Sequence, residues 1–300
     1  MSDYDPDEAE IEASRAPLLD HLIELRKRLI ICVVAIVAGF ALCFGFATPI
    51  YNFLLHPFQV AAEMFASQRE TGHGGGGPFD LLLVLVGLKE VDMAGGESLR
   101  LVFTAPLEFF FTKLKLAGFG AIVVTFPVLA WQVYAFVAPG LYKRERRAFL
   151  PFLVAAPVLF LMGAALVYFV ILPFVLWFSL SQQIIGAGIA VELLPKVSDY
   201  LTLVTTLLLA FGLCFQLPVV LTLLGLAGIV NSAMLMKGWR YAVFGVVVVA
   251  AIVTPPDPIS QLLLATPIVG LYFISVGCVR LIERRRDKED AASGKDIVPT

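Results

Sequence analysis

Hydrophobic residues occur along this chain in long unbroken runs separated by polar segments. Six runs have the character of membrane-spanning helices, at residues 29–47, 116–138, 148–172, 200–229, 241–253 and 259–279. A helix needs about 20 mostly apolar residues to cross the hydrocarbon core of a bilayer. The runs lack the periodicity of half-buried helices or strands. The pattern therefore predicts an all-α integral membrane protein with six transmembrane helices.

The last two predicted spans are short. The fifth has 13 residues and ends against the turn at residues 254–258. This is below the usual length of about 17 to 25 residues and would imply local thinning of the bilayer. Prolines inside the runs bend helices because they remove backbone donors, and they stand at Pro127, Pro157, Pro218 and Pro267. We therefore expect a concave, glove-like arrangement rather than a sealed bundle.

The polar segments divide the chain into three parts. Residues 1–20 are acidic and predict a disordered tail, residues 21–282 form the six-helix membrane domain, and residues 283–300 form a second tail. Between the first two spans lies a long outer loop, 48–112, which contains a glycine run typical of a flexible linker. Its apolar stretch at 79–88 is too short to cross a bilayer and predicts an interfacial or packed segment.

The distribution of basic residues predicts the orientation. Sixteen Lys and Arg residues fall in the two terminal segments and alternate loops on one side, against six on the other. Cytoplasmic loops carry this excess, so both termini should be cytoplasmic, N-in and C-in. The first run follows Arg26, Lys27 and Arg28 directly and is longer than the roughly 7 to 15 apolar residues of a cleaved signal peptide. It is interpreted as a permanent first helix.

The composition of the chain excludes several classes of function. Of the 300 residues, 59% are hydrophobic and 15% charged, which leaves too few charges to cover a water-facing surface. The net charge of -2 gives no field that would attract nucleic acid. Catalytic and phosphate-binding motifs are missing, the four cysteines lack metal-ligand spacing, and the runs hold almost no ionisable side chain. We therefore expect neither an enzyme nor a bound cofactor.

Two carboxylates stand inside basic clusters at the predicted cytoplasmic face. Glu24 lies in His21–Arg28, and Glu145 lies in Leu141–Arg147. One reading is that each acid pairs with neighbouring cations at a helix end, for well under about 1 kcal/mol. The other is that both form a receptor for guanidinium groups, which bind carboxylates bidentately through a planar fork. The residues alone leave both readings open.

A polar side chain also interrupts the fourth run. Gln216 stands two residues before Pro218, near the middle of an otherwise apolar segment. Such a group seeks a partner in the membrane, and a helix-packing hydrogen bond worth about 0.6 to 2 kcal/mol would suffice without any role in transport.

Five stretches together resemble the TatC family, the polytopic subunit of the twin-arginine protein translocase. They read HLIELRKR at 21–28, APLEFFFTKLKL at 105–116, WQVYAFVAPGLYKRERR at 131–147, FGLCFQLPV at 211–219 and TPPD at 254–257. The resemblance implies a receptor for signal peptides with consecutive arginines. It also implies export of folded proteins, driven by the proton motive force, across the cytoplasmic (inner) membrane of a bacterium.

The same resemblance assigns candidate residues. Glu24 and Glu145 correspond to the acids that hold the two signal arginines, while Arg26, Arg144 and Arg146 shape the site around them. Pro106 and Phe109 match positions tied to assembly and activity, although they could simply be a turn and an apolar anchor.

Gln216 and Pro218 match the concave side that docks small single-span subunits of the TatA and TatB type, within a hetero-complex that also holds further copies of the chain and membrane lipid. The family often has glutamate where this chain has Gln216, and an amide cannot titrate.

Two other function classes make different predictions. A small-solute secondary transporter should have broken helices with charge at the bilayer midplane and an inverted repeat between its halves, and neither feature is present in the sequence. A structural scaffold without transport activity would leave Glu24 and Glu145 freely replaceable.

Overall fold

The structure is a computed structural model of the chain, and it describes residues 6–71, 78–88, 101–137, 150–182, 184–186, 189–191, 195–253 and 258–293. These residues form mainly helices. In chain order the elements are α1 (Pro6–Gly45), α2 (Ala47–Thr71), α3 (Pro78–Leu85), α4 (Glu108–Val137), α5 (Leu150–Leu166), the π-helical turn η2 (Val167–Ile171), α6 (Leu172–Ser181), β1 (Ile184–Gly186), β2 (Ile189–Val191), α7 (Val197–Cys214), α8 (Leu217–Leu226), α9 (Ser232–Val253) and α10 (Pro258–Ser293). Strands β1 and β2 pair antiparallel as a small hairpin.

Six helical stretches of the described residues are long and apolar enough to cross a bilayer. They are His21–Gly45, Glu108–Phe136, Val154–Ser181, Val197–Leu226, Ser232–Val253 and Gln261–Arg285. The prediction of six transmembrane helices is confirmed. The third stretch runs from α5 through η2 into α6, and the fourth consists of α7 and α8.

The fifth span is longer than its apolar run. The last two spans have 22 and 25 residues and are shorter than the second, third and fourth, which have 29, 28 and 30. However, α9 begins at Ser232, so the predicted length of 13 residues is wrong. Lys237 and Arg240 lower the hydropathy of this segment without opposing a helix, because both are good helix formers. A helix of 22 residues can cross a bilayer without thinning it.

Both terminal segments continue the neighbouring helices. Helix α1 begins at Pro6, inside the segment 1–20 that was expected to be a disordered tail. Helix α10 continues to Ser293, past the boundary predicted at residue 282. Once a helix is nucleated inside a packed domain, each further residue adds one hydrogen bond, so a polar segment of good helix formers can extend it.

The predicted outer loop contains two helices. Helix α2 is amphipathic and buries Leu54, Phe58 and Ala61 at helical spacing. Helix α3 buries Leu81, which is 1% exposed, whereas Phe79 and Leu88 are exposed, so the apolar stretch at 79–88 packs on the core along one side only. The loop prediction is therefore wrong for α2 because its apolar face was not recognised in a segment of low overall hydropathy.

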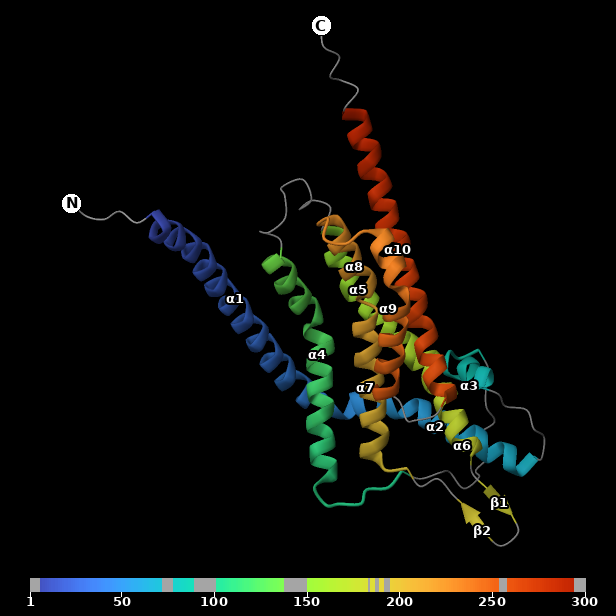
Figure 1. Cartoon of the computed structure of the whole chain (residues 1–300). Helices are drawn as coiled ribbons and strands as arrows, with labels where there is room; N and C mark the ends of the chain where they lie inside the picture. The colour runs from blue at the N-terminus through green and yellow to red at the C-terminus, as the bar shows by residue number, and fades with distance from the viewer. Residues whose placement is uncertain are drawn as a thin grey trace.

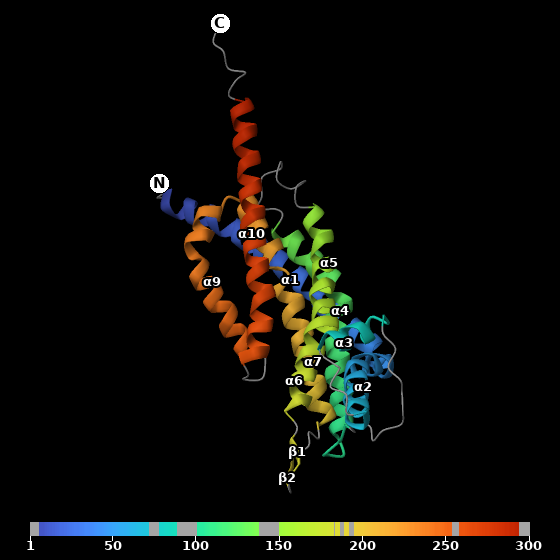
Figure 2. The ribbon, with the colours of Figure 1, turned by 90° about the vertical axis from the view of Figure 1, so that its right-hand side faces the viewer.

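The helices are arranged in neighbouring pairs. Helix α1 packs on α4, α5 on α7, and α10 on both α8 and α9. Figure 1 shows that α2, α3 and the hairpin lie at one end of the molecule, whereas the N-terminal end of α1 and the C-terminal end of α10 lie at the other. At this second end the helices splay, with α1 leaning away from α4 in Figure 1 and α9 from α10 in Figure 2. The open arrangement agrees with the predicted glove-like shape.

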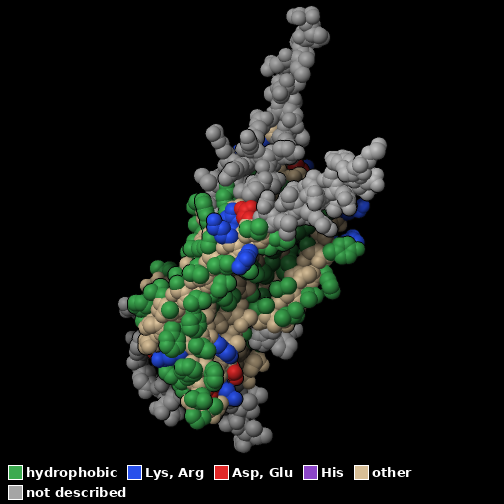
Figure 3. Space-filling model, turned by 90° about the vertical axis from the view of Figure 1, so that its left-hand side faces the viewer, with side chains coloured by type: hydrophobic (Ala, Val, Ile, Leu, Met, Phe, Trp, Pro, Cys, Tyr) green, Lys and Arg blue, Asp and Glu red, His purple; other side chains and the backbone are tan. Residues whose placement is uncertain are grey.

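The surface of this array is suited to lipid. On the face shown in Figure 3, hydrophobic side chains form a broad band, and Lys and Arg side chains gather mainly towards its two ends. Inside the array, α5 and α7 approach closely. A Cβ atom on Gly163 would lie 2.7 Å from the Phe211 carbonyl oxygen, and one on Gly212 would lie 2.5 Å from the Phe160 ring. Only glycine fits at these two crossing points, as is common between membrane helices.

Candidate functional site

One face of α1 carries three polar side chains towards α4. His21, Glu24 and Arg28 are spaced by three and four residues, so they lie along one side of the helix. The His21 ring stacks on Phe136 of α4, with ring centroids 4.4 Å apart. We call His21, Glu24, Arg28 and Gln132 the rim network. It lies at the end of the molecule where α1 begins and α10 ends.

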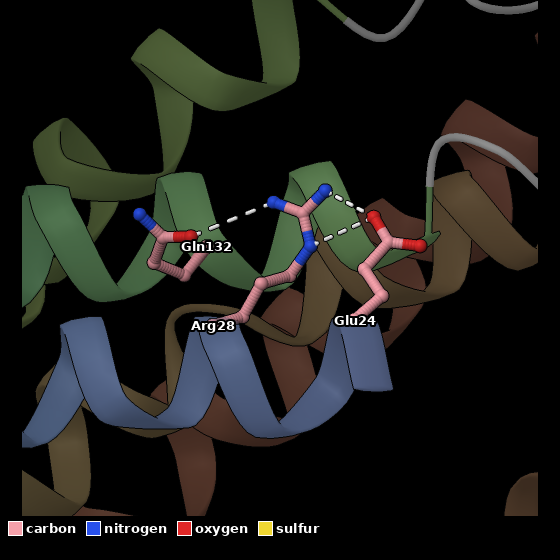
Figure 4. A network of polar contacts seen from close by, with 3 residues as sticks. All are labelled: Glu24, Arg28 and Gln132. Carbon is pink, nitrogen blue, oxygen red and sulfur yellow. Dashed lines mark hydrogen bonds and ion pairs between the residues drawn. The ribbon is translucent and has the colours of Figure 1, made fainter. Parts of the chain in front are cut away.

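Arg28 is the centre of the rim network (Figure 4). Its Nε donates a hydrogen bond of 3.0 Å to Oε1 of Glu24, and its Nη2 donates to the same oxygen. Its Nη1 lies 3.5 Å from the amide oxygen of Gln132, across the contact between α1 and α4. The side chains of Arg28 and Glu24 are 23% and 33% exposed, so the pair is accessible from the surface.

This pairing corresponds to the first of the two readings of Glu24, in which the acid binds a cation of its own helix. An exposed pair spaced by four residues contributes only about 0.3 to 0.5 kcal/mol, so it is easily exchanged. Among the described residues, the second carboxylate oxygen of Glu24, Oε2, accepts no hydrogen bond. The carboxylate can therefore take a further donor.

The other residues assigned to this region are placed differently. Arg26 is exposed and makes no hydrogen bond or ion pair with the side chains that the structure describes. Glu145, Arg144 and Arg146 lie outside the described residues. They belong to the connection between Val137, the last residue of α4, and Leu150, the first of α5.

Of the four residues of the rim network, sequence reasoning assigned a role only to Glu24 and gave none to His21, Arg28 or Gln132. The spacing of four residues between Glu24 and Arg28 could have identified their ion pair, because such residues are neighbours on a helix surface. Gln132 is 104 residues from Arg28 and gives no comparable signal. Only the packing of α1 on α4 brings them together.

Pro106 and Phe109 lie at the opposite end of α4. Pro106 is the second residue of a tight turn closed by a hydrogen bond of 3.1 Å from the Glu108 N–H to the Ala105 carbonyl, a position that proline favours. The Phe109 ring meets the rings of Phe103 and Tyr51 edge to face, with centroids 5.5 and 6.1 Å apart. The ammonium of Lys113 lies 4.6 Å from its centroid. In this geometry Pro106 belongs to a turn, and Phe109 is an aromatic anchor.

Glu108 fastens this turn to α7. Its Oε2 accepts hydrogen bonds from the backbone N–H groups of Thr104 and Ala105, at 2.6 and 3.1 Å. Its Oε1 accepts from the Ser198 hydroxyl at 2.5 Å. Beside this cluster, burial raises the pKa of the Tyr51 hydroxyl above its ordinary value.

Gln216 lies at the junction of α7 and α8. The junction bends because Pro218 has no N–H to continue the helix, and the Gln216 N–H donates to Leu213, three residues back, at 2.9 Å. The side-chain amide donates to the Ala156 carbonyl of α5 at 2.9 Å and lies 3.5 Å from the Gly212 carbonyl. This is the helix-packing hydrogen bond that one reading predicted. Among the described residues, the Gln216 amide oxygen accepts no hydrogen bond.

The candidate residues thus form three separate groups. Glu24 belongs to the rim network, Pro106 and Phe109 lie at the other end of α4, and Gln216 and Pro218 lie at the bend between α7 and α8. Within the described part of the chain, no three His, Cys, Asp or Glu side chains gather as metal ligands would.

Comparison with known proteins gives consistent matches. Residues 20–267 match the model of the family described as Sec-independent protein translocase protein (TatC). The chain is 40% identical to the Sec-independent protein translocase protein TatC of Magnetococcus marinus over 278 residues, which are 93% of this chain and 89% of that protein. It is 34% identical to the TatC protein of Synechocystis over 278 residues, covering 92% and 91% of the two chains.

Two solved structures are also similar. One is a crystal structure of the twin arginine translocase receptor TatC, with a TM-score of 0.65, 29% identity, and coverage of 87% of this chain and 98% of that chain. The other, of the same receptor in DDM, has a TM-score of 0.67, 30% identity, and coverage of 85% and 97%.

Proposed function

This chain belongs to the TatC family of Sec-independent protein translocase proteins, and we propose that it binds twin-arginine signal peptides through the rim at Glu24. The observation that carries this proposal is a carboxylate, one third exposed, at the end of a membrane-spanning helix and already in contact with a guanidinium group. A second guanidinium, from a peptide, has the same complementarity to it.

In the proposed site, Glu24 and Glu145 each hold one signal arginine. Two acids match two consecutive arginines, and each bidentate contact uses the planar fork that lysine lacks. Arg26, Arg144 and Arg146 shape the site by limiting where a cationic peptide can approach, because like charges repel across short distances. The stacked pair of His21 and Phe136 supports the position of Glu24 relative to α4.

We propose that the rim faces the cytoplasm of a bacterial cell, with the protein in the inner membrane. The ends of α1 and α10 lie at the same end of the molecule (Figure 1), and the excess of Lys and Arg falls in the segments assigned to that side. A signal peptide on a newly made protein would meet the rim there before translocation.

Transport itself requires partners. A chain with six spans cannot enclose a pore wide enough for a folded protein, so small single-span subunits of the TatA and TatB type and further copies of this chain complete the path, which is driven by the proton motive force. The amide oxygen of Gln216 accepts no hydrogen bond from the residues that the structure describes, and beside the bend at Pro218 it offers such a helix an acceptor. Pro106 and Phe109 would hold the outer turn in shape for assembly.

The function is transport of proteins rather than of small solutes. Each relative and structure named above is a translocase protein, and none of the observations on the rim favours a small-solute site.

Binding of a synthetic signal peptide to the detergent-solubilised protein tests the proposal. Peptides with Arg-Arg and Lys-Lys are compared on wild type and on the double variant Glu24→Gln plus Glu145→Gln. We expect each replacement to weaken binding by about tenfold or more, since each lost contact to a charged group costs over about 1 kcal/mol. The matched control is Asp199→Asn, an exposed acid in the first turn of α7. Equal binding in all combinations would refute the proposed site.

A further inference from the structure

Arg28 occupies the carboxylate that the proposed function assigns to a signal arginine. We propose that Arg28 is an internal substitute for that arginine, and that a peptide guanidinium displaces it from Glu24 onto Gln132 of α4. This inference rests on the proposed function. It adds that binding of the peptide moves the Arg28 side chain.

The geometry at Glu24 requires displacement. Nε and Nη2 of Arg28 both donate to Oε1, so this oxygen already accepts two hydrogen bonds from one guanidinium group. A bidentate contact from a peptide arginine needs Oε1 and Oε2 together. It cannot form while Arg28 stays in place.

Gln132 is positioned to receive the displaced side chain. Its amide oxygen already lies 3.5 Å from Nη1 of Arg28, at the outer limit of a hydrogen bond (Figure 4). A small movement of the guanidinium towards α4 would shorten this contact. Because the Arg28 side chain is only 23% exposed, an alternative acceptor matters once Glu24 is lost.

The displacement of Arg28 distinguishes a peptide arginine from a peptide lysine. A lysine ammonium is a compact point charge that can bind Oε2, to which none of the described residues donates, and leave Arg28 on Oε1. Lysine would therefore bind without releasing Arg28, whereas arginine would transfer it. The transfer would tighten the link between α1 and α4 beside the stack of His21 on Phe136. Binding of arginine, but not of lysine, would thus change the contact between α1 and α4. The rim would distinguish the two residues by this structural change as well as by affinity.

Removing the Arg28 guanidinium, which competes for Glu24, should raise the affinity for an Arg-Arg peptide. We expect Arg28→Gln to tighten binding of an Arg-Arg peptide by about twofold to fivefold, the range set by the weakness of an accessible ion pair. Lys27→Gln is the matched control. It removes the same charge one residue away, at an exposed side chain that the structure does not pair with Glu24. Lys-Lys peptides should bind both variants alike.

A double-mutant cycle tests the acceptor. Gln132→Leu should weaken binding of the Arg-Arg peptide about twofold in wild type and have no effect in the Arg28→Gln background. In NMR spectra of protein labelled at arginine, the Arg28 Nε–H signal should shift with the Arg-Arg peptide and stay unchanged with the Lys-Lys peptide. Thermal unfolding of each variant establishes that the fold is intact.

Several results would overturn the inference. They are weaker Arg-Arg binding by Arg28→Gln, tightening no greater than with Lys27→Gln, or an effect of Gln132→Leu that is equal in both backgrounds. The proposed function is tested separately by Glu24→Gln. If this variant binds Arg-Arg peptides as wild type does, the receptor role of Glu24 fails. If it binds them weakly and Arg28→Gln does not tighten binding, only the displacement of Arg28 is refuted.

Discussion

The hydroxyl of Tyr168 donates a hydrogen bond of 2.9 Å to the backbone carbonyl of Phe53, 115 residues away. The reason lies four residues after Phe53, where Pro57 has no N–H to donate to this carbonyl. The two aromatic rings also stack, with centroids 4.5 Å apart. Tyr168, in the π-helical turn η2, therefore supplies the donor that Pro57 cannot, and the Tyr200 hydroxyl donates to the neighbouring Leu54 carbonyl at 2.9 Å.

Tyr168→Phe should destabilise the protein by about 1 kcal/mol, because the Phe53 carbonyl loses its donor while the ring stack remains. Thermal unfolding in detergent measures the change. Tyr241→Phe is the control, since Tyr241 is 83% exposed and its hydroxyl makes no hydrogen bond within the described residues. An unchanged melting temperature for Tyr168→Phe would mean that water or detergent replaces the hydroxyl.

Gln216→Met should separate packing from partner docking. The variant loses the hydrogen bond to the Ala156 carbonyl, and we expect a stability loss of about 0.6 kcal/mol. If the Gln216 amide oxygen binds a partner helix, co-purification of single-span subunits should fall several-fold, although the fold remains. Gln182→Met, at the exposed end of α6, is the control. Normal co-purification with Gln216→Met would limit this residue to helix packing.

Glu108→Ala should loosen the turn before α4. The variant removes the acceptor of the Thr104 and Ala105 amides and of the Ser198 hydroxyl. Hydrogen exchange at Thr104 and Ala105 should become about tenfold faster, because these amides lose their partners. Asp199→Ala, a nearby exposed acid, should leave the exchange unchanged. Slow exchange in Glu108→Ala would show that other contacts hold the turn.

Glu283→Ala should destabilise the start of α9. Glu283 of α10 accepts the Ser232 N–H at 2.7 Å and also the Ser232 hydroxyl, while the Asn231 side chain accepts the Met234 N–H at 2.7 Å. Losing this cap should cost about 1 kcal/mol and speed amide exchange in the first turn of α9. Arg284→Ala provides the neighbouring control. Glu283 lies one residue past the boundary predicted at residue 282, and this contact joins it to the start of α9.

The sequence predicted those features that depend on local composition. Long apolar runs must be helices in a bilayer, because hydrocarbon offers no partner for backbone polar groups, and all six were found. Gln216 was recognised because an amide stands out in an apolar run. Helix α2 was missed because it is amphipathic and its segment has a low overall hydropathy, so a search for long apolar runs does not find it.

By itself, the sequence determined the number of spans, the basic clusters and the candidate acids, since each depends on residue type and spacing along the chain. Tertiary structure alone decided which groups meet. It set Arg28 between Glu24 and Gln132, the Tyr168 hydroxyl against the Phe53 carbonyl of α2, and Glu283 on the first turn of α9. Three of these contacts join residues 51 to 115 positions apart. Such pairings follow from how helices cross, and no local pattern encodes the crossing.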